Sequence, residues 1–179
     1  MASKHWEIDP AHSEIHFKIR HLLISNISGA FNIFSGTMVT PVHDNFKDAY
    51  FTLKIDVYSI DTNNEDRDEH LKSDDFFNAD AYPEITYLST EFTHIDGDNY
   101  KLTGDLTIKG TTRQVTFDVL FGGQAKDGFG ISRAGFEING VIDRNDFDIH
   151  PAEAAEASGI ILGEEIKLHA NIQYINKPE

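Results

Sequence analysis

The sequence predicts an all-β fold, an extended antiparallel β-barrel of about eight strands. Three observations lead to this class: apolar and polar residues alternate along several segments, turn residues separate these segments, and glycines occur inside them. The 179 residues contain no linker rich in proline, glycine or serine. We therefore expect a single domain that spans residues 1–179.

Alternation defines the expected strands, because successive side chains of a strand point to opposite faces. In residues 14–21, Ile15, Phe17 and Ile19 share one face, and His21 is the next residue on it. The same period recurs in residues 50–57, 100–108, 114–121 and 165–174. Each of these segments is apolar on one face only, so the sheet must either stack on a second sheet or close on itself.

Turns and glycines favour closure into a barrel. Turn sequences at residues 95–98, 109–111 and 126–128 have hairpin spacing, which makes successive strands antiparallel neighbours. Glycine occurs at the expected bends of these long strands, at Gly29, Gly36, Gly104, Gly135 and Gly140. Long strands with glycine bends fit a strongly coiled barrel better than a short-stranded sandwich.

Two segments break the strand pattern. Residues 62–65 have the spacing of a capping box, and Arg67, His70 and Leu71 follow at helical intervals, which predicts a short helix near residues 63–72. Residues 145–158 contain Pro151 followed by strong helix formers. We expect a helical or irregular crossover there.

Composition excludes several classes of protein and site. Thirty acidic residues against fifteen basic ones give a net charge of −15, which repels nucleic acid. The absence of cysteine excludes disulfides and thiolate sites. No apolar run approaches roughly 18 residues, so the chain is not expected to be embedded in a membrane. Because no apolar leader opens the sequence, we expect a cytoplasmic protein as written, and a periplasmic or secreted one if a signal peptide was removed.

Motifs for catalysis and metal binding are absent from the sequence. It has no Gly-x-Ser-x-Gly elbow, no phosphate-binding glycine loop and no His-Glu-x-x-His. His12 and His16 have a spacing that suits one helical face, but they lie at the entry of a strand, where their rings would not converge. We expect no metal site, no cofactor and no catalytic residue.

An ordered set of short motifs then resembles a known family. The motifs run from Trp6-Glu7-Ile8-Asp9, His12-Ser13 and His21-Leu22 through Gly29-Ala30-Phe31, Ser59-Ile60-Asp61-Thr62, Arg67-Asp68, His70-Leu71, Asp75-Phe76-Phe77, Tyr82-Pro83, Gly104 to Thr112, and Gly135-Phe136 to Arg144-Asn145-Asp146-Phe147. This set is similar to the YceI-like family of polyisoprenoid-binding, lipocalin-like barrels. The resemblance implies a barrel that holds a long-chain isoprenoid such as a quinone or polyprenyl chain, often as a homodimer. Asp148 and His150 depart from the family pattern, in which glycine and an aromatic residue are common.

The expected ligand site is the inward face of the barrel. Its apolar walls are predicted to be Ile15, Phe17, Ile19, Phe31, Ile33, Leu53, Ile55, Leu102, Leu106, Ile108, Phe117 and Val119. Residues 67–77 are expected to form a lid, with Phe76 and Phe77 inserted among Leu71, Ile85 and Tyr87. The alternative is that the two rings simply complete a solid core.

Two polar residues have two interpretations each. His21 either donates a hydrogen bond to a ligand head group or is a satisfied histidine at a strand end, and we favour the second interpretation. Arg67 either clamps a pyrophosphate or quinone oxygen or pairs with Asp68, Asp74 or Asp75 to fix the loop. The many nearby carboxylates favour pairing.

Three functions follow from these expectations. The first is a non-enzymatic protein that sequesters or transports a long-chain amphiphilic lipid. The second is an enzyme that acts on an isoprenoid or fatty-acyl chain, with His21 as a base. The third is an interaction module with a filled barrel that dimerises through its outward strand faces. The first function requires that the inward side chains leave an apolar tunnel unfilled from end to end and do not meet in the middle.

Overall fold

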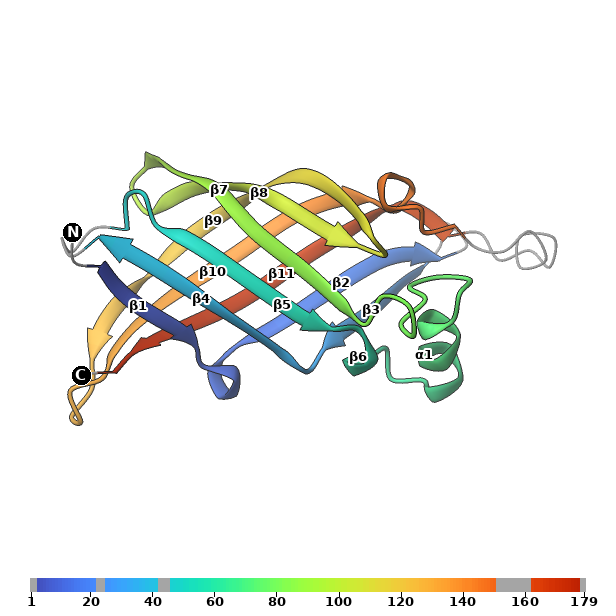
Figure 1. Cartoon of the computed structure of the whole chain (residues 1–179), viewed down its shortest axis with the longest axis horizontal. Helices are drawn as coiled ribbons and strands as arrows, with labels where there is room; N and C mark the ends of the chain where they lie inside the picture. Colours follow the sequence, from blue (N-terminus) through green and yellow to red (C-terminus); the bar gives the residue numbers. More distant parts are fainter. Residues whose placement is uncertain (1–2, 22–24, 42–45, 151–161, 178–179) are drawn as a thin grey trace.

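The computed structural model describes residues 3–21, 25–41, 46–150 and 162–177 (Figure 1). Its strands are β1 (Ser3–Ile8), β2 (Glu14–His21), β3 (Ser25–Phe31), β4 (Phe34–Pro41), β5 (Tyr50–Asp56), β6 (Ile60–Asp61), β7 (Glu84–Asp96), β8 (Asn99–Ile108), β9 (Thr111–Lys126), β10 (Ser132–Asp143) and β11 (Leu162–Asn176). The helical elements are α1 (Glu65–Lys72) and the 3-10 turns η1 (Pro10–His12), η2 (Val57–Ser59) and η3 (Arg144–Phe147).

The strands form a closed antiparallel barrel, which confirms the predicted fold class. The order β1-β4-β5-β7-β8-β9-β10-β11 is closed by pairing of β1 with β11, where Glu7 lies opposite Ile175. β2, β3 and β6 extend the sheet beyond this ring of eight strands. The predicted hairpins join β7 to β8, β8 to β9 and β9 to β10.

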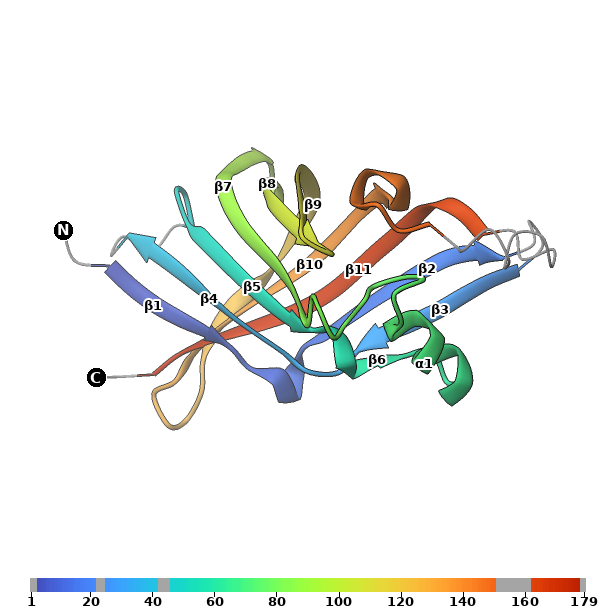
Figure 2. The ribbon, with the colours of Figure 1, turned by 45° about the vertical axis from the view of Figure 1, so that its right-hand side comes forward.

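At two places in the sheet, two consecutive strands are separated only by a short interruption. β1 and β2 both run along β11 and are separated by η1, while β3 and β4 are separated at Asn32 and Ile33. Beyond that break, β3 has only the two residues of β6 as a neighbour on its far side. Residues 57–83, which include β6 and α1, lie along this side of the barrel (Figure 2).

The prediction that Ile33 forms part of the cavity wall is wrong, because the residue lies at the interruption between β3 and β4. Its side chain is 61% exposed, because Ile33 lies in the connection between β3 and β4 and not within a strand. The alternation that begins at Phe31 therefore stops before it. Phe34, the first residue of β4, packs against the core.

Helix α1 lies within the predicted range, but its cap differs from the predicted box. Asn64 is the N-cap, and its side chain accepts a hydrogen bond from the Arg67 amide at 2.9 Å. The Thr62 hydroxyl instead donates to Asp68 at 2.5 Å. Of the second irregular segment, residues 145–147 form the end of η3, Asp148 follows in a left-handed turn, and residues 151–158 lie outside the described part of the chain.

One end of the barrel, opposite α1, is filled by aromatic rings. The Phe51 ring lies 4.9 Å from that of Phe92 and 5.9 Å from that of Phe136, and the Phe46 ring lies 5.0 Å from that of Phe121. Trp6 is buried beside them and donates to the Thr40 hydroxyl at 3.2 Å. This aromatic cluster (Trp6, Phe46, Phe51, Phe92, Phe121 and Phe136) leaves room for a ligand only toward the α1 end.

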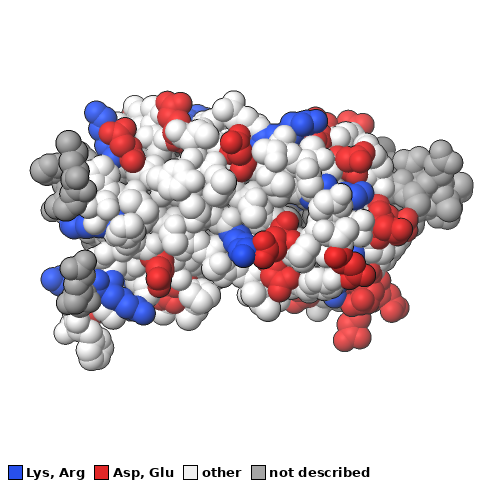
Figure 3. Space-filling model, viewed as in Figure 1, with Lys and Arg blue, Asp and Glu red and all other residues white. Residues whose placement is uncertain are grey.

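Charge is distributed unevenly between the two ends. Figure 3 shows acidic side chains gathered around the end that carries α1. The first turn of α1 alone contributes Glu65, Asp66 and Asp68. The negative potential is therefore strongest at this end of the molecule.

Hydrogen bonds to Asp9 stabilise the connection between β1 and β2, and their contribution to the stability of the protein depends on pH. Asp9 accepts hydrogen bonds from Arg133 at 3.0 Å, from His12 at 2.8 Å and from the Ala11 amide at 3.2 Å. Burial acts to raise the pKa of Asp9, but these hydrogen bonds outweigh it and lower that pKa below its usual value. The stability that Asp9 contributes is therefore complete above its unfolded pKa of about 4 and is lost as pH falls through the lower folded pKa.

We expect Asp9→Asn to lower the free energy of unfolding by roughly 1 kcal/mol at pH 7 and by less at low pH. Urea unfolding at a series of pH values below neutrality measures this difference. Glu164→Gln, at an exposed position of β11, is the control and should follow the parent protein. A constant difference between Asp9→Asn and the parent across the series would contradict the expectation.

Candidate functional site

The barrel contains an apolar cavity of about 300 Å³. Its inner end is formed by buried residues that include Phe51, Tyr87 and Tyr174, next to the aromatic cluster. Its outer end is formed by half-buried residues that include Leu71 and Leu162. The cavity therefore starts at the filled end of the barrel and opens toward α1. The interior is neither solid nor a tunnel that runs from end to end.

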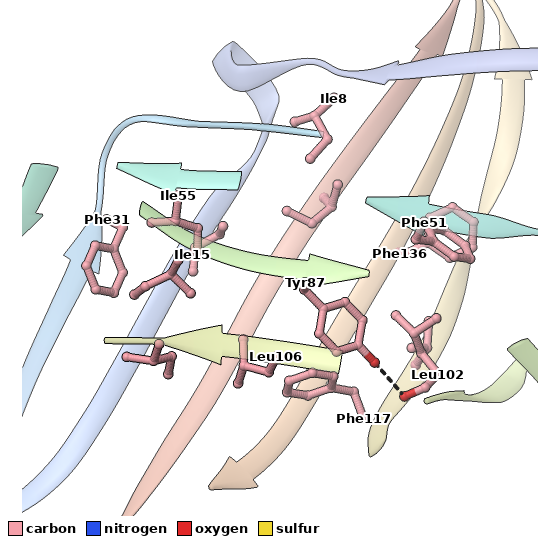
Figure 4. Close-up of a cluster of buried hydrophobic side chains, with 14 of the residues drawn as sticks. Ile8, Ile15, Phe31, Phe51, Ile55, Tyr87, Leu102, Leu106, Phe117 and Phe136 are labelled. Atoms are coloured by element: carbon pink, nitrogen blue, oxygen red, sulfur yellow. Dashed lines mark hydrogen bonds between the residues drawn. The ribbon is translucent and has the colours of Figure 1, made fainter. Parts of the chain in front are cut away.

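Most predicted wall residues line this cavity. Figure 4 shows several of them gathered from different strands, including Ile15, Phe31, Ile55, Leu106 and Phe117. The predicted residues that line it are Ile15, Phe17, Ile19, His21, Phe31, Leu53, Ile55, Arg67, Leu71, Phe76, Phe77, Ile85, Leu102, Leu106, Ile108 and Phe117. Ile33 and Val119 do not. Val119 is buried but lies opposite Tyr100, whose ring stacks on Phe92 in the filled end.

The prediction missed an entire wall. It is supplied by β10, β11 and the segment that follows η3, through Ile138, Ile142, Ile149, Leu162, Ile166, Leu168, Ala170, Ile172 and Tyr174. Alternation in residues 165–174 already places the β11 members on one face of a strand, so this signal could have identified them. Ile149 and Leu162 have no such signal, because Ile149 lies outside any strand and a register shift separates Leu162, the first residue of β11, from Ile166.

The segment after α1 covers the cavity on the side of β3. Phe77 packs edge-on against Phe31 with ring centroids 6.1 Å apart, and its amide donates to the Leu71 carbonyl at 3.0 Å. Phe76 is buried and packs edge-on against the His70 ring at 5.0 Å. Both phenylalanines line the cavity, so they bound an open space and do not complete a solid core.

Polar groups at the α1 end are held mainly by the protein itself. The buried Arg144 guanidinium donates to the carbonyls of Gly163 at 2.9 Å, Ile149 at 3.0 Å and Leu162 at 3.4 Å. Arg67 donates to the hydroxyl and the carbonyl of Thr62, at 2.8 and 2.5 Å. The predicted pairing of Arg67 with Asp68, Asp74 or Asp75 is therefore wrong, because Thr62 takes its Nε and Nη2 groups.

The other polar lining residues at this end differ in their contacts. His70 lies 2.8 Å from the Asp75 carboxylate, so its ring is anchored to the segment that follows α1. His21 is half-buried, and its ring makes no hydrogen bond to another residue in the described ranges. The two interpretations of His21 thus remain predictions.

Two tyrosines lie at the inner end of the cavity. The Tyr87 hydroxyl donates to the carbonyls of Leu102 at 3.2 Å and Val115 at 3.1 Å, and Figure 4 marks the first of these bonds. Burial raises the pKa of Tyr87 and that of Tyr174 well above the usual value of 10.0. Both hydroxyls therefore stay protonated and neutral at any physiological pH.

A glycine shapes the wall opposite these rings. A Cβ atom at Gly140 would lie 2.3 Å from Cδ1 of Phe117, so the Phe117 ring occupies the space that a side chain would need. We expect Gly140→Ala to displace this ring and to lower the free energy of unfolding by about 1–3 kcal/mol, as overpacking does. Urea unfolding measures it, and Gly122→Ala, where the nearest atom is 3.4 Å away, is the matched control. Equal effects of the two substitutions would contradict this packing argument.

The chain is similar to proteins of one family. A family model described as the YceI-like domain matches residues 6–174. A UPF0312 protein of Staphylococcus epidermidis is 36% identical over 170 residues, which cover 94% of this chain and 96% of the relative. The crystal structure of the Campylobacter jejuni YCEI protein matches with a TM-score of 0.77 and 34% identity, covering 90% of this chain and 91% of that chain.

A more distant structure shares the fold. It is a polyisoprenoid-binding domain from Saccharophagus degradans, with a TM-score of 0.68 and 12% identity, covering 96% of this chain and 98% of that one. Within the described residues, no helix has the length and apolar character needed to span a bilayer. No group of three or more histidine or acidic side chains there is arranged to hold a metal ion.

Proposed function

The chain belongs to the YceI-like domain family, and from this membership and its cavity we propose that it binds a long-chain amphiphilic lipid. The ligand class that we propose is an isoprenoid, such as a quinone or a polyprenyl chain, held for sequestration or transport without catalysis. The single observation that carries the proposal is the apolar cavity inside the barrel. Apolar walls bind such chains by removing their surface from water, without a strong polar contact.

The distant fold neighbour supports the ligand class. Its title describes it as polyisoprenoid-binding, and its similarity to this chain is one of fold. A barrel with this arrangement of strands can therefore enclose an isoprenoid chain. The covering residues Leu71 and Phe77 supply further apolar surface at the outer end of the cavity, where a chain would emerge.

The size of the cavity limits how much of a ligand is enclosed. A cavity of about 150 Å³ accommodates benzene, so about 300 Å³ accommodates on the order of a dozen heavy atoms. At roughly 0.3 kcal/mol per atom, this part alone gives about 4 kcal/mol, or near-millimolar affinity. We infer that a longer chain continues into the outer end of the barrel between α1 and β3, or widens the cavity.

Solvent extraction of freshly purified protein tests the proposal. Native mass spectrometry, compared with a denatured control, should show added mass that appears in the organic extract as an apolar chain. Protein stripped of this mass should take up an added long-chain quinone and release it chemically unchanged. Protein that carries no added mass and takes up no lipid would contradict the proposal. Release of an altered lipid, with the alteration abolished by His21→Ala, would instead establish an enzyme.

A further inference from the structure

Tyr174 differs from Tyr87 in one respect that concerns the ligand. Its side chain is only 4% exposed, and it packs against Phe51 and Phe136 with ring centroids 5.9 Å away in each case. Its hydroxyl makes no hydrogen bond to any residue that the structure describes, whereas the Tyr87 hydroxyl has two carbonyl partners.

The unpartnered hydroxyl of Tyr174 belongs to a residue that lines the cavity. Within the described residues, every fully covered polar side-chain atom has a hydrogen-bond partner. The Tyr174 oxygen has no partner, so it is not fully covered by protein. Tyr174 lies on the inward face of β11 with Ile172 and Ala170, and all three line the cavity. The incompletely covered hydroxyl thus belongs to a side chain on the wall of the cavity.

The surroundings of this hydroxyl define the group that it would bind. Keeping a hydroxyl without a partner in an apolar space is unfavourable, and a hydrogen bond to an acceptor on a ligand compensates for this cost. Arg67 and Arg144, the two arginines that line the cavity, lie at the opposite, α1 end. With no compensating cation nearby, a neutral acceptor is favoured over an anionic one. The ring of Phe51, which lines the cavity, adds a flat surface against which a planar ring can pack.

We propose that the Tyr174 hydroxyl donates a hydrogen bond to a neutral carbonyl oxygen on a planar ligand head group, of which a quinone is the model. This assignment deepens the proposed function and rests on it. The head group lies at the closed, aromatic end of the cavity, and the chain runs outward toward α1. The ligand therefore enters head first.

At the α1 end, most polar lining side chains already have hydrogen-bond partners in the protein, which agrees with this orientation. Arg144 and Arg67 donate to protein carbonyls and to Thr62, and His70 is paired with Asp75. A head group bound there would compete with these contacts. His21 is the remaining candidate for the reverse orientation, in which the chain enters first.

A cycle of two ligands and two proteins tests the assignment. The ligands are decylbenzoquinone and decylbenzene, which share a chain and a ring but differ in the carbonyl oxygens. Tyr174→Phe should bind the quinone about fivefold to tenfold more weakly than the parent protein does, and should bind decylbenzene within about twofold of the parent. Calorimetric titration gives the four affinities.

Controls separate a specific contact from a general disturbance. Tyr174→Phe removes no hydrogen bond to any described residue, so its melting temperature should equal or exceed that of the parent. Tyr87→Phe removes two internal hydrogen bonds, and it should lower the melting temperature while affecting both ligands alike. The carbonyl stretch of bound quinone should shift to lower frequency in the parent and shift back in Tyr174→Phe.

The outcomes distinguish the assignment from the function on which it rests. If the parent protein binds neither ligand, both the proposed function and the assignment fail. If both ligands bind and Tyr174→Phe weakens them equally or not at all, the protein binds lipids and the assignment alone is wrong. A loss that is specific to the quinone in His21→Ala but absent in Tyr174→Phe would establish the reverse orientation.

Discussion

Replacement of Arg144 by alanine is expected to lower the free energy of unfolding by about 3–4 kcal/mol and the melting temperature by roughly 10 °C. The guanidinium joins η3 to the start of β11, because it donates to the Ile149 carbonyl and to those of Leu162 and Gly163. Its loss leaves several buried carbonyl groups without a donor. Urea and thermal unfolding of the variant measure the effect.

Two further variants separate the effect of the three hydrogen bonds of the Arg144 guanidinium from the effect of its charge and provide a control. Arg144→Lys keeps the charge but cannot reach three carbonyls at once, so its stability should lie between those of the parent and Arg144→Ala. Arg113→Ala removes an exposed arginine of β9 and should change stability by no more than about 0.5 kcal/mol. A loss below about 1 kcal/mol in Arg144→Ala would show that Arg144 does not clamp this segment.

The barrel was predictable from sequence because each strand buries only one face. Alternation is a local property, and residues 14–21 and 100–108 show it without reference to any partner strand. The positions at which strands are interrupted depend on the partner strands and cannot be predicted from local alternation. Ile33 continues the alternation of Phe31 in the sequence, but the chain turns there so that β4 can pair with β5.

The cavity was harder to predict than its walls. Inward positions follow from alternation, which correctly placed residues such as Phe17 and Leu106 on its walls. Whether inward side chains meet or leave a space depends on their lengths at facing positions around the barrel. Phenylalanines converge at one end, whereas the β11 wall contributes the small side chain of Ala170 near the middle. No single strand reveals this difference.

The interior of the barrel thus has two regions with different roles. The aromatic cluster belongs to the hydrophobic core and fixes the closed end, where large rings bury much apolar area. The cavity lowers stability, because its walls lack contacts that a filled core would provide. A cavity retained at such a cost is consistent with a ligand that restores these contacts.

Filling the cavity is expected to affect stability and binding in opposite directions. Ala170 lies on the inward face of β11 opposite Ile15 and Ile138 and lines the cavity. Ala170→Phe adds a ring that needs about 150 Å³, half of the space. It should leave the free energy of unfolding unchanged or up to about 2 kcal/mol higher.

The same ring excludes about six ligand atoms, so affinity for a long-chain quinone should fall roughly twentyfold. Lys167→Phe introduces the same side chain at an exposed, outward position of β11 and should leave affinity unchanged. Unfolding in urea and titration with decylbenzoquinone measure the two effects. If Ala170→Phe bound the quinone as tightly as the parent, the ligand would lie outside the barrel, since no misfolding can leave affinity intact.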